Sequence, residues 1–158
     1  MDGDAIPLQQ VLVSAVGSSL YGGYENINKN QYYTSHEHGG PQLYIVTVEI
    51  GIGREGIAEM NGNRLKKIGE ERIVQNGKII GFYKIWDASR YGTGKFTYEN
   101  TSMSHPWNTE YRTNIYLYKI NNAALLLEVL TYSAMYSPLI PRKASRILPP
   151  QNPMNSAS

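Results

Sequence analysis

Hydrophobic and polar residues alternate in short runs over most of the chain. The clearest run is LYIVTVEI at residues 43–50, where alternate positions from Tyr44 to Ile50 are apolar and the other face turns polar at Thr47 and Glu49. A two-residue period predicts a β-strand, and a strand that begins apolar on both faces is expected near the middle of a sheet. Further strand-like runs, each bounded by glycine or polar residues, are LQQVLVSAV, IAEM, NRLKKI, ERIVQ, KIIGFYKIW, KFTYEN and TEYRTNIYLYKI.

Two Asn-Gly pairs separate neighbouring strand-like runs, at Asn61-Gly62 and Asn76-Gly77. Asn-Gly is the preferred pair in a two-residue type I′ turn, because both positions need a positive φ. No helical period precedes residue 121. The pattern therefore predicts an all-β fold, with a single antiparallel β-sandwich or jelly-roll-like domain over residues 8–120.

The last forty residues differ from this pattern. Residues 121–136 form an apolar segment with good helix formers after Asn122, which favours a short helix over a strand. Residues 137–158 hold five of the eight prolines and are expected to form a flexible Pro-rich tail. If residues 123–135 are exposed, they offer a surface for a homo-oligomer or another partner.

Composition narrows the function classes. The 158 residues include 13 tyrosines, 15 glycines and no cysteine, so the chain is tyrosine-rich and thiolate chemistry is excluded. The net charge of +2 indicates no nucleic-acid partner, and the basic cluster RLKK at 64–67 is typical of a soluble edge strand. No run of 18 apolar residues is present, so the chain is not expected to span a membrane.

GIGREG at residues 51–56 matches the glycine spacing of a dinucleotide-binding loop. That loop must open a helix, whereas this one leads into the hairpin around Asn61, so a bulge or wide turn explains the glycines better. We expect no bound cofactor. The alternative is a zinc ion at an open three-histidine site made of His36, His38 and His105. The simpler interpretation is that His36 and His38 belong to a hydrogen-bonded polar loop.

Two loops combine tryptophan with polar side chains. IWDASRYGTG holds one tryptophan and SHPWNTEY holds the other. Aromatic faces beside Asp, Asn and Arg are typical of carbohydrate recognition, and packing of the tryptophans in the core is the competing interpretation. The candidate ligand-binding residues are Trp86, Asp87, Arg90, Tyr91, Trp107 and Asn108.

Residues 11–119 resemble the YolA-like family of small secreted bacterial and prophage proteins, a domain of unknown function. The resemblance lies in AVGSSLYGGYENIN, EHGG, VTVEIGIG, EMNG, WDAS and YENTSMSHPWNT, in that order. It implies secretion, a single β domain and no established activity, so it assigns no catalytic residue. MDGDAIPLQQ lacks the features of a signal peptide, and we expect that the leader is absent from this chain.

The leading hypothesis is a secreted, non-enzymatic binding module that recognises a glycan or another cell-surface ligand through its aromatic loops. Two alternatives belong to other classes. One is a small metal-dependent hydrolase that uses the three histidines, and the other is a secreted prophage-type toxin or effector.

Overall fold

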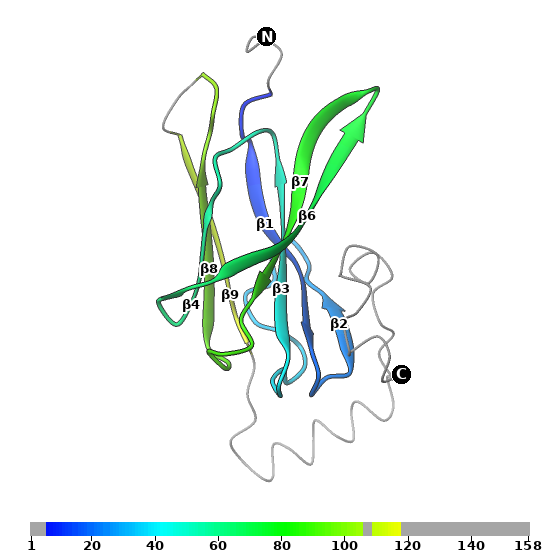
Figure 1. Ribbon diagram of the computed structural model, residues 1–158, viewed down its shortest axis with the longest axis vertical. Coiled ribbons are helices and arrows are strands. Elements are labelled where there is room, and N and C mark those ends of the chain that lie inside the picture. Colours follow the sequence, from blue (N-terminus) through cyan, green and yellow to red (C-terminus); the bar gives the residue numbers. More distant parts are fainter. Residues whose placement is uncertain (1–5, 106–108, 118–158) are drawn as a thin grey trace.

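The computed structural model describes residues 6–105 and 109–117, and the regular structure of these residues is entirely β (Figure 1). The all-β prediction is confirmed. The strands are β1 (Gln10–Ser18), β2 (Gly23–Asn26), β3 (Leu43–Ile50), β4 (Ile57–Met60), β5 (Asn63–Arg64), β6 (Lys66–Gln75), β7 (Lys78–Asp87), β8 (Lys95–Thr101) and β9 (Glu110–Tyr116). The apolar segment 121–136 and the tail 137–158 lie outside the described residues. Within the described part of the chain there is no helix long and apolar enough to cross a membrane.

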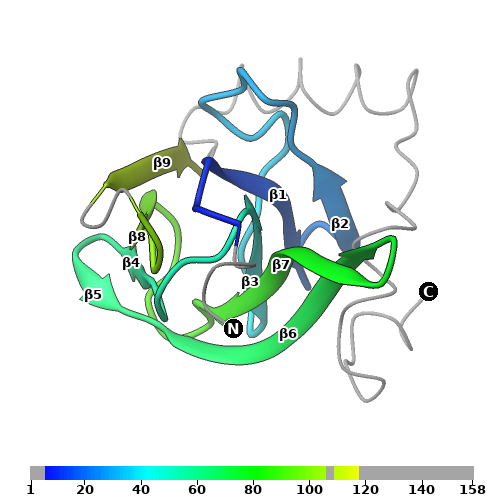
Figure 2. The same cartoon turned by 90° about the horizontal axis from the view of Figure 1, so that it is seen from above.

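The strands form two antiparallel sheets that lie face to face (Figure 2). The five-stranded sheet has the order β2-β1-β3-β7-β6, and the four-stranded sheet has the order β5-β4-β8-β9. The main core lies between the sheets and joins residues from both. Its largest members include Trp86 from β7, Phe96 and Tyr98 from β8 and Ile115 from β9. This arrangement is the sandwich that the alternation predicts.

Strand β3 lies at the centre of the five-stranded sheet, as its sequence predicts, but its polar face is the more buried one. Thr47 and Glu49 are each 1% exposed, whereas Tyr44, Val48 and Ile50 are only half-buried. Burial of a carboxylate is costly unless the group is paired and hydrogen-bonded. Glu49 therefore has partners in the interior, and these partners define the candidate site.

The chain passes from one sheet to the other at Leu65. Arg64 ends β5 in the four-stranded sheet, Lys66 begins β6 in the five-stranded sheet, and the Leu65 amide donates to the Ala58 carbonyl at 2.9 Å. Figure 2 shows β6 sweeping around one side of the molecule from β5 to its hairpin with β7. Strand β6 is also an edge strand, and two irregularities in its register with β7 limit further pairing along that edge.

Both Asn-Gly turns have the predicted geometry. Asn61 and Gly62 have φ values of 53° and 82°, and Asn76 and Gly77 have φ values of 52° and 76°. In each pair both central residues are left-handed, as a type I′ turn requires. The first turn joins β4 to β5 and the second joins β6 to β7, so both hairpin predictions are confirmed.

Candidate functional site

A cavity of about 440 Å³ opens beside the loop between β3 and β4. Its walls come from this loop and from both β6 and β7, and a residue after β8 completes the lining. The lining residues are Ile52, Gly53, Arg54, Glu55, Glu70, Phe82, Lys84 and Met103. A volume in this range, with an aromatic ring and a few polar groups, is typical of a small-molecule site.

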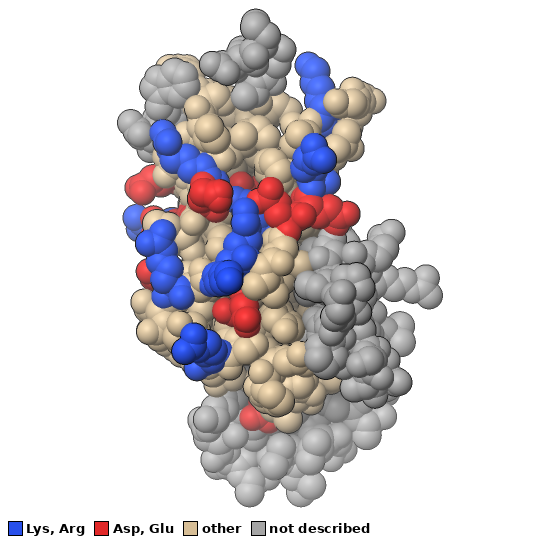
Figure 3. Space-filling model, viewed as in Figure 1, with Lys and Arg blue, Asp and Glu red and all other residues tan. Residues whose placement is uncertain are grey.

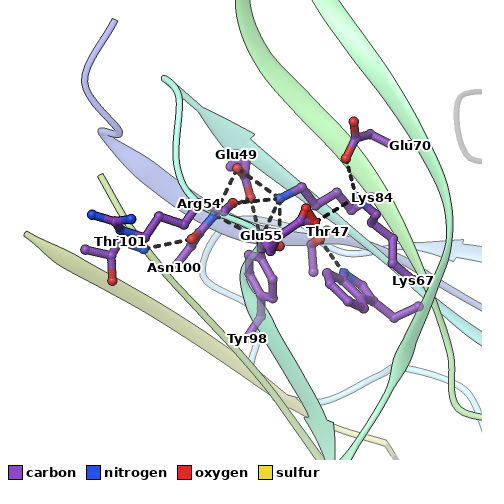
Figure 4. A network of polar contacts seen from close by, with 11 residues as sticks. Thr47, Glu49, Arg54, Glu55, Lys67, Glu70, Lys84, Tyr98, Asn100 and Thr101 are labelled. Carbon is purple, nitrogen blue, oxygen red and sulfur yellow. Dashed lines mark hydrogen bonds and ion pairs between the residues drawn. The ribbon is translucent and has the colours of Figure 1, made fainter. Parts of the chain in front are cut away.

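Lys84 and the backbone of Arg54 and Glu55, which line the cavity, belong to a buried polar network that joins the two sheets (Figure 4). Glu49 Oε1 accepts a hydrogen bond from the Tyr98 hydroxyl at 2.5 Å, and Glu49 Oε2 accepts one from Asn100 Nδ2 at 3.1 Å. The Lys84 ammonium lies 3.4 Å from Glu49 Oε2 and completes the pairing of the carboxylate. The acid comes from β3, the lysine from β7, and the phenol and amide from β8, so the network connects the five-stranded sheet to the four-stranded sheet through side-chain hydrogen bonds.

Lys84 also holds the wall of the cavity in place. Its Nζ donates to the Arg54 carbonyl at 3.3 Å and to the Glu55 carbonyl at 3.0 Å, while Asn100 Nδ2 donates to the Arg54 carbonyl at 2.9 Å. Figure 4 shows Lys84 directed toward both carbonyls and Glu49. Because buried donors and acceptors are costly to leave unpaired, this loop is fixed before any ligand arrives.

Two of the three glycines of GIGREG lie so close to neighbouring atoms that a side chain would not fit. A Cβ on Gly51 would lie 2.0 Å from the Pro7 carbonyl oxygen, and one on Gly56 would lie 2.2 Å from the Tyr98 hydroxyl. Gly51 and Gly56 also have φ values of 91° and 85°, in the left-handed region that favours glycine. The loop leads into strand β4, so the expectation of a turn rather than a dinucleotide fingerprint is consistent with the fold.

Burial and the neighbouring Glu49 charge raise the pKa of Tyr98 well above its usual value of 10.0, and its hydrogen bond to Glu49 acts in the same direction. Tyr98 therefore remains a neutral phenol that donates its proton to Glu49. Because Tyr98 and Glu49 are each 1% exposed, neither side chain can touch a ligand in the cavity. Their role is to position Lys84 and the loop.

The described aromatic-loop residues have different environments. Trp86 is 4% exposed in the core, where its Nε1 donates to Thr47 Oγ1 at 2.9 Å, so its ring faces are closed to a ligand. Asp87 accepts from the Ser89 amide at 3.0 Å, Arg90 is exposed, and Tyr91 packs against the core. Trp107 and Asn108 lie outside the described residues.

The three histidines do not come together. His38 contacts Ser18 at the end of β1, whereas His105 follows Ser102, whose hydroxyl accepts from the Leu8 amide before β1 begins. The ten steps along the chain from Leu8 to Ser18 span roughly 30 Å at about 3.3 Å per residue. Over residues 6–105 and 109–117, no group of three His, Asp or Glu side chains has the arrangement of a metal site.

His36 and His38 instead meet Glu25, an acid that the sequence analysis does not single out. Glu25 is 6% exposed, and its carboxylate accepts from His38 Nε2 at 2.9 Å and from the Ser35 amide at 2.6 Å. Burial alone would raise the pKa of Glu25, but the hydrogen bonds from His38 and Ser35 outweigh it and hold the pKa below the ordinary 4.5. The histidine pair is therefore part of a hydrogen-bonded loop.

A serine, a histidine and a glutamate are hydrogen-bonded in the order of a catalytic triad, but a substrate cannot reach them: Ser18, His38 and Glu25. An ionised Glu25 only accepts, so His38 donates from Nε2, and its Nδ1 then accepts from the Ser18 hydroxyl at 2.9 Å. Ser18 Oγ in turn accepts from the Tyr21 amide at 3.2 Å. Because Ser18 is 0% exposed, no substrate reaches this hydroxyl, and the array serves the fold.

Comparison with known proteins gives one match. The family model described as "Domain of unknown function (DUF4879)" matches residues 3–117, which covers the described strands. No curated protein and no solved structure matches this chain.

Proposed function

We propose that this chain, which belongs to the DUF4879 family, is a non-enzymatic binding module whose ligand occupies the cavity beside the β3–β4 loop. The observation that carries the proposal is the preformed wall. The carbonyls of Arg54 and Glu55 are tied to buried side chains on β7 and β8, and the Arg54 amide donates to the Thr101 carbonyl at 2.9 Å. A site ordered in advance loses little conformational entropy when it binds.

The lining favours an uncharged, polyhydroxylated ligand such as a sugar. Lys84 is already paired with Glu49, and the Lys67 ammonium lies 2.6 Å from Glu70 and 3.6 Å from Glu55. With Arg54 the charges around the cavity therefore cancel, so the cavity attracts neither a phosphate nor a cation strongly. Phe82 is half-buried and offers an aromatic wall against which the C–H face of a sugar ring packs. Figure 3 shows basic and acidic side chains interspersed over one face of the molecule, which is consistent with a neutral target.

Secretion and a cell-surface glycan target are part of the proposal. They rest on the resemblance to the YolA-like secreted proteins and on the chemistry of the cavity. A toxin or effector would use the same binding step, and a growth-inhibition assay with the purified protein distinguishes the two. The metal-dependent hydrolase loses its main support, because His105 lies far from His36 and His38.

The test is a glycan array followed by titration of each captured sugar against the isotope-labelled chain by NMR. Glu70→Gln replaces a carboxylate acceptor of the cavity lining, which is paired with Lys67, by a neutral amide, and Glu71→Gln is its matched control on the same strand but outside the lining. We expect Glu70→Gln to weaken binding about fivefold, since one hydrogen bond contributes about 1 kcal/mol. Capture of no glycan, or equal binding by both variants, contradicts the proposal.

A further inference from the structure

A second surface lies on the outer face of β8 and β9, away from the core. In the register of this pair, Lys95 lies opposite Tyr116, Thr97 opposite Asn114 and Glu99 opposite Arg112. The alternate residues Phe96, Tyr98 and Ile115 are buried, so the first set faces outward. We call these six outward residues the β8–β9 strip.

Five residues of the β8–β9 strip line a shallow groove on this sheet face. The groove has a volume of about 350 Å³ and is lined by Lys95, Thr97, Tyr98, Glu99, Arg112, Thr113 and Asn114. Hydroxyl, amide and charged groups thus line an open trough that runs along the strands. From Lys95 to Glu99 the strip is roughly 13 Å long at about 3.3 Å per residue, which suits an extended ligand better than a single small molecule.

Tyrosine rings stand at one end of the strip. Tyr33 stacks on Tyr116 with ring centroids 5.1 Å apart and an angle of 22° between the planes, and Lys95 Nζ lies 5.6 Å from the centre of the Tyr116 ring. Backbone hydrogen bonds fix this pair, because the Tyr116 amide donates to Tyr32 at 2.8 Å and the Thr34 amide donates to Tyr116 at 3.0 Å. Tyr33 nevertheless remains 60% exposed.

An exposed tyrosine stack of this kind suits binding of a ligand or partner, because each ring combines an apolar face with a polar hydroxyl. Two of the three charges of the strip, Glu99 and Arg112, are already paired, and Lys95 lies over the Tyr116 ring. Arg112 lies 3.9 Å from Glu99 and 3.8 Å from Glu110, so it does not offer the unpaired positive charge that a nucleic acid needs. The remaining chemistry is flat aromatic surface, hydroxyls and amides.

We propose that the β8–β9 strip, with the Tyr33–Tyr116 stack, binds an extended polysaccharide chain. A sugar unit packs on the exposed ring of Tyr33, and the following units hydrogen-bond along Thr97 and Asn114. No residue that lines this groove also lines the β3–β4 cavity, and the proposal stands whether or not that cavity holds a ligand.

The experiment is a pull-down of the full chain on insoluble cellulose, chitin and bacterial peptidoglycan, with the dissociation constant taken from the depletion curve. Tyr33→Ala and Asn114→Ala test the strip. Tyr32→Ala is the matched control, because Tyr32 is 63% exposed beside Tyr33 while the stack joins Tyr33 to Tyr116. Phe82→Ala in the cavity separates this proposal from the proposed function.

We expect at least one polymer to retain the wild-type chain, and Tyr33→Ala to weaken its retention about fivefold to tenfold, as the loss of an aromatic contact does. Tyr32→Ala and Phe82→Ala should leave retention on that polymer within about twofold, a change under 0.5 kcal/mol. Retention on no polymer, an unchanged Tyr33→Ala, or an equal loss in Tyr32→Ala overturns the proposal.

Discussion

Replacement of Lys84 by methionine tests whether the buried network holds the two sheets together. The change keeps an unbranched side chain that is one atom shorter and removes its charge. Glu49, at 1% exposure, would then have only the phenol and the amide of β8 as partners, and the Glu55 carbonyl would lose the Lys84 hydrogen bond. Breaking a buried ion pair from one side costs about 3–5 kcal/mol. Since small domains are stable by about 5–15 kcal/mol, the loss would remove a large share of the total.

Urea unfolding followed by tryptophan fluorescence measures this cost in the full chain. The Trp86 ring lies 5.5 Å from the Tyr98 ring beside the network, so its emission reports the loss of this region. Lys78→Met on the same strand is the control, and because Lys78 is exposed, we expect a change within about 0.5 kcal/mol. The double variant Glu49→Leu/Lys84→Met leaves no unpaired charge, so it should be more stable than Lys84→Met.

A cost below about 1 kcal/mol for Lys84→Met would refute this account, because that is the value of an ordinary exposed pair. A double variant less stable than the single variant would also refute it. If Lys84→Met does not fold, Glu49→Gln gives the same test with a smaller change of shape.

Three further predictions concern other parts of the fold. Because the folded pKa of Glu25 is lowered, its contribution to stability is present above its ordinary pKa of 4.5 and is lost as the pH falls through the lower folded value. Glu25→Gln should therefore cost about 1.5–3 kcal/mol of unfolding free energy at neutral pH, and it should flatten the pH dependence of the urea midpoint below pH 4.5. Gly56→Ala should destabilise the domain by about 1–3 kcal/mol more than Gly77→Ala, because both glycines have positive φ but only Gly56 would place a Cβ against Tyr98; equal melting temperatures would contradict this. Burial and the Glu25 charge raise the pKa of Tyr21 to about 12. Tyr21→Phe should therefore remove a step near that pH from the alkaline absorbance titration of the tyrosines. Loss of a step near pH 10 instead would show that the assignment is wrong.

Local signals predict the β architecture well. Alternation locates β3 at 43–50, and the Asn-Gly pairs locate two hairpins, because a turn with two positive φ values restricts the residues that can occupy it. The pairing of β1 with β3 and the passage of the chain between sheets at Leu65 depend on contacts between distant segments. No local pattern contains that information.

The candidate site is hard to predict for a related reason. Glu49 and Lys84 each interrupt an apolar run, VTVEI and KIIGFYKIW, and a single charge in such a run is usually placed on the solvent face. Their inward orientation becomes visible only when the register sets β3 beside β7, with Glu49 opposite Phe82 and Thr47 opposite Lys84. The sequence feature that could have indicated this buried pair is one acidic residue in one predicted central strand and one basic residue in another.

The passage of the chain at Leu65 has a consequence for how the domain opens. Since β5 and β6 are consecutive segments of one backbone, the sheets are joined by a covalent link as well as by side chains. Sliding of one sheet over the other would also strain the Leu65–Ala58 hydrogen bond, because Ala58 belongs to the four-stranded sheet and Leu65 leads into the five-stranded one. Amide hydrogen exchange should accordingly show β3, β7 and β8 exchanging together as one cooperative unit rather than one sheet at a time.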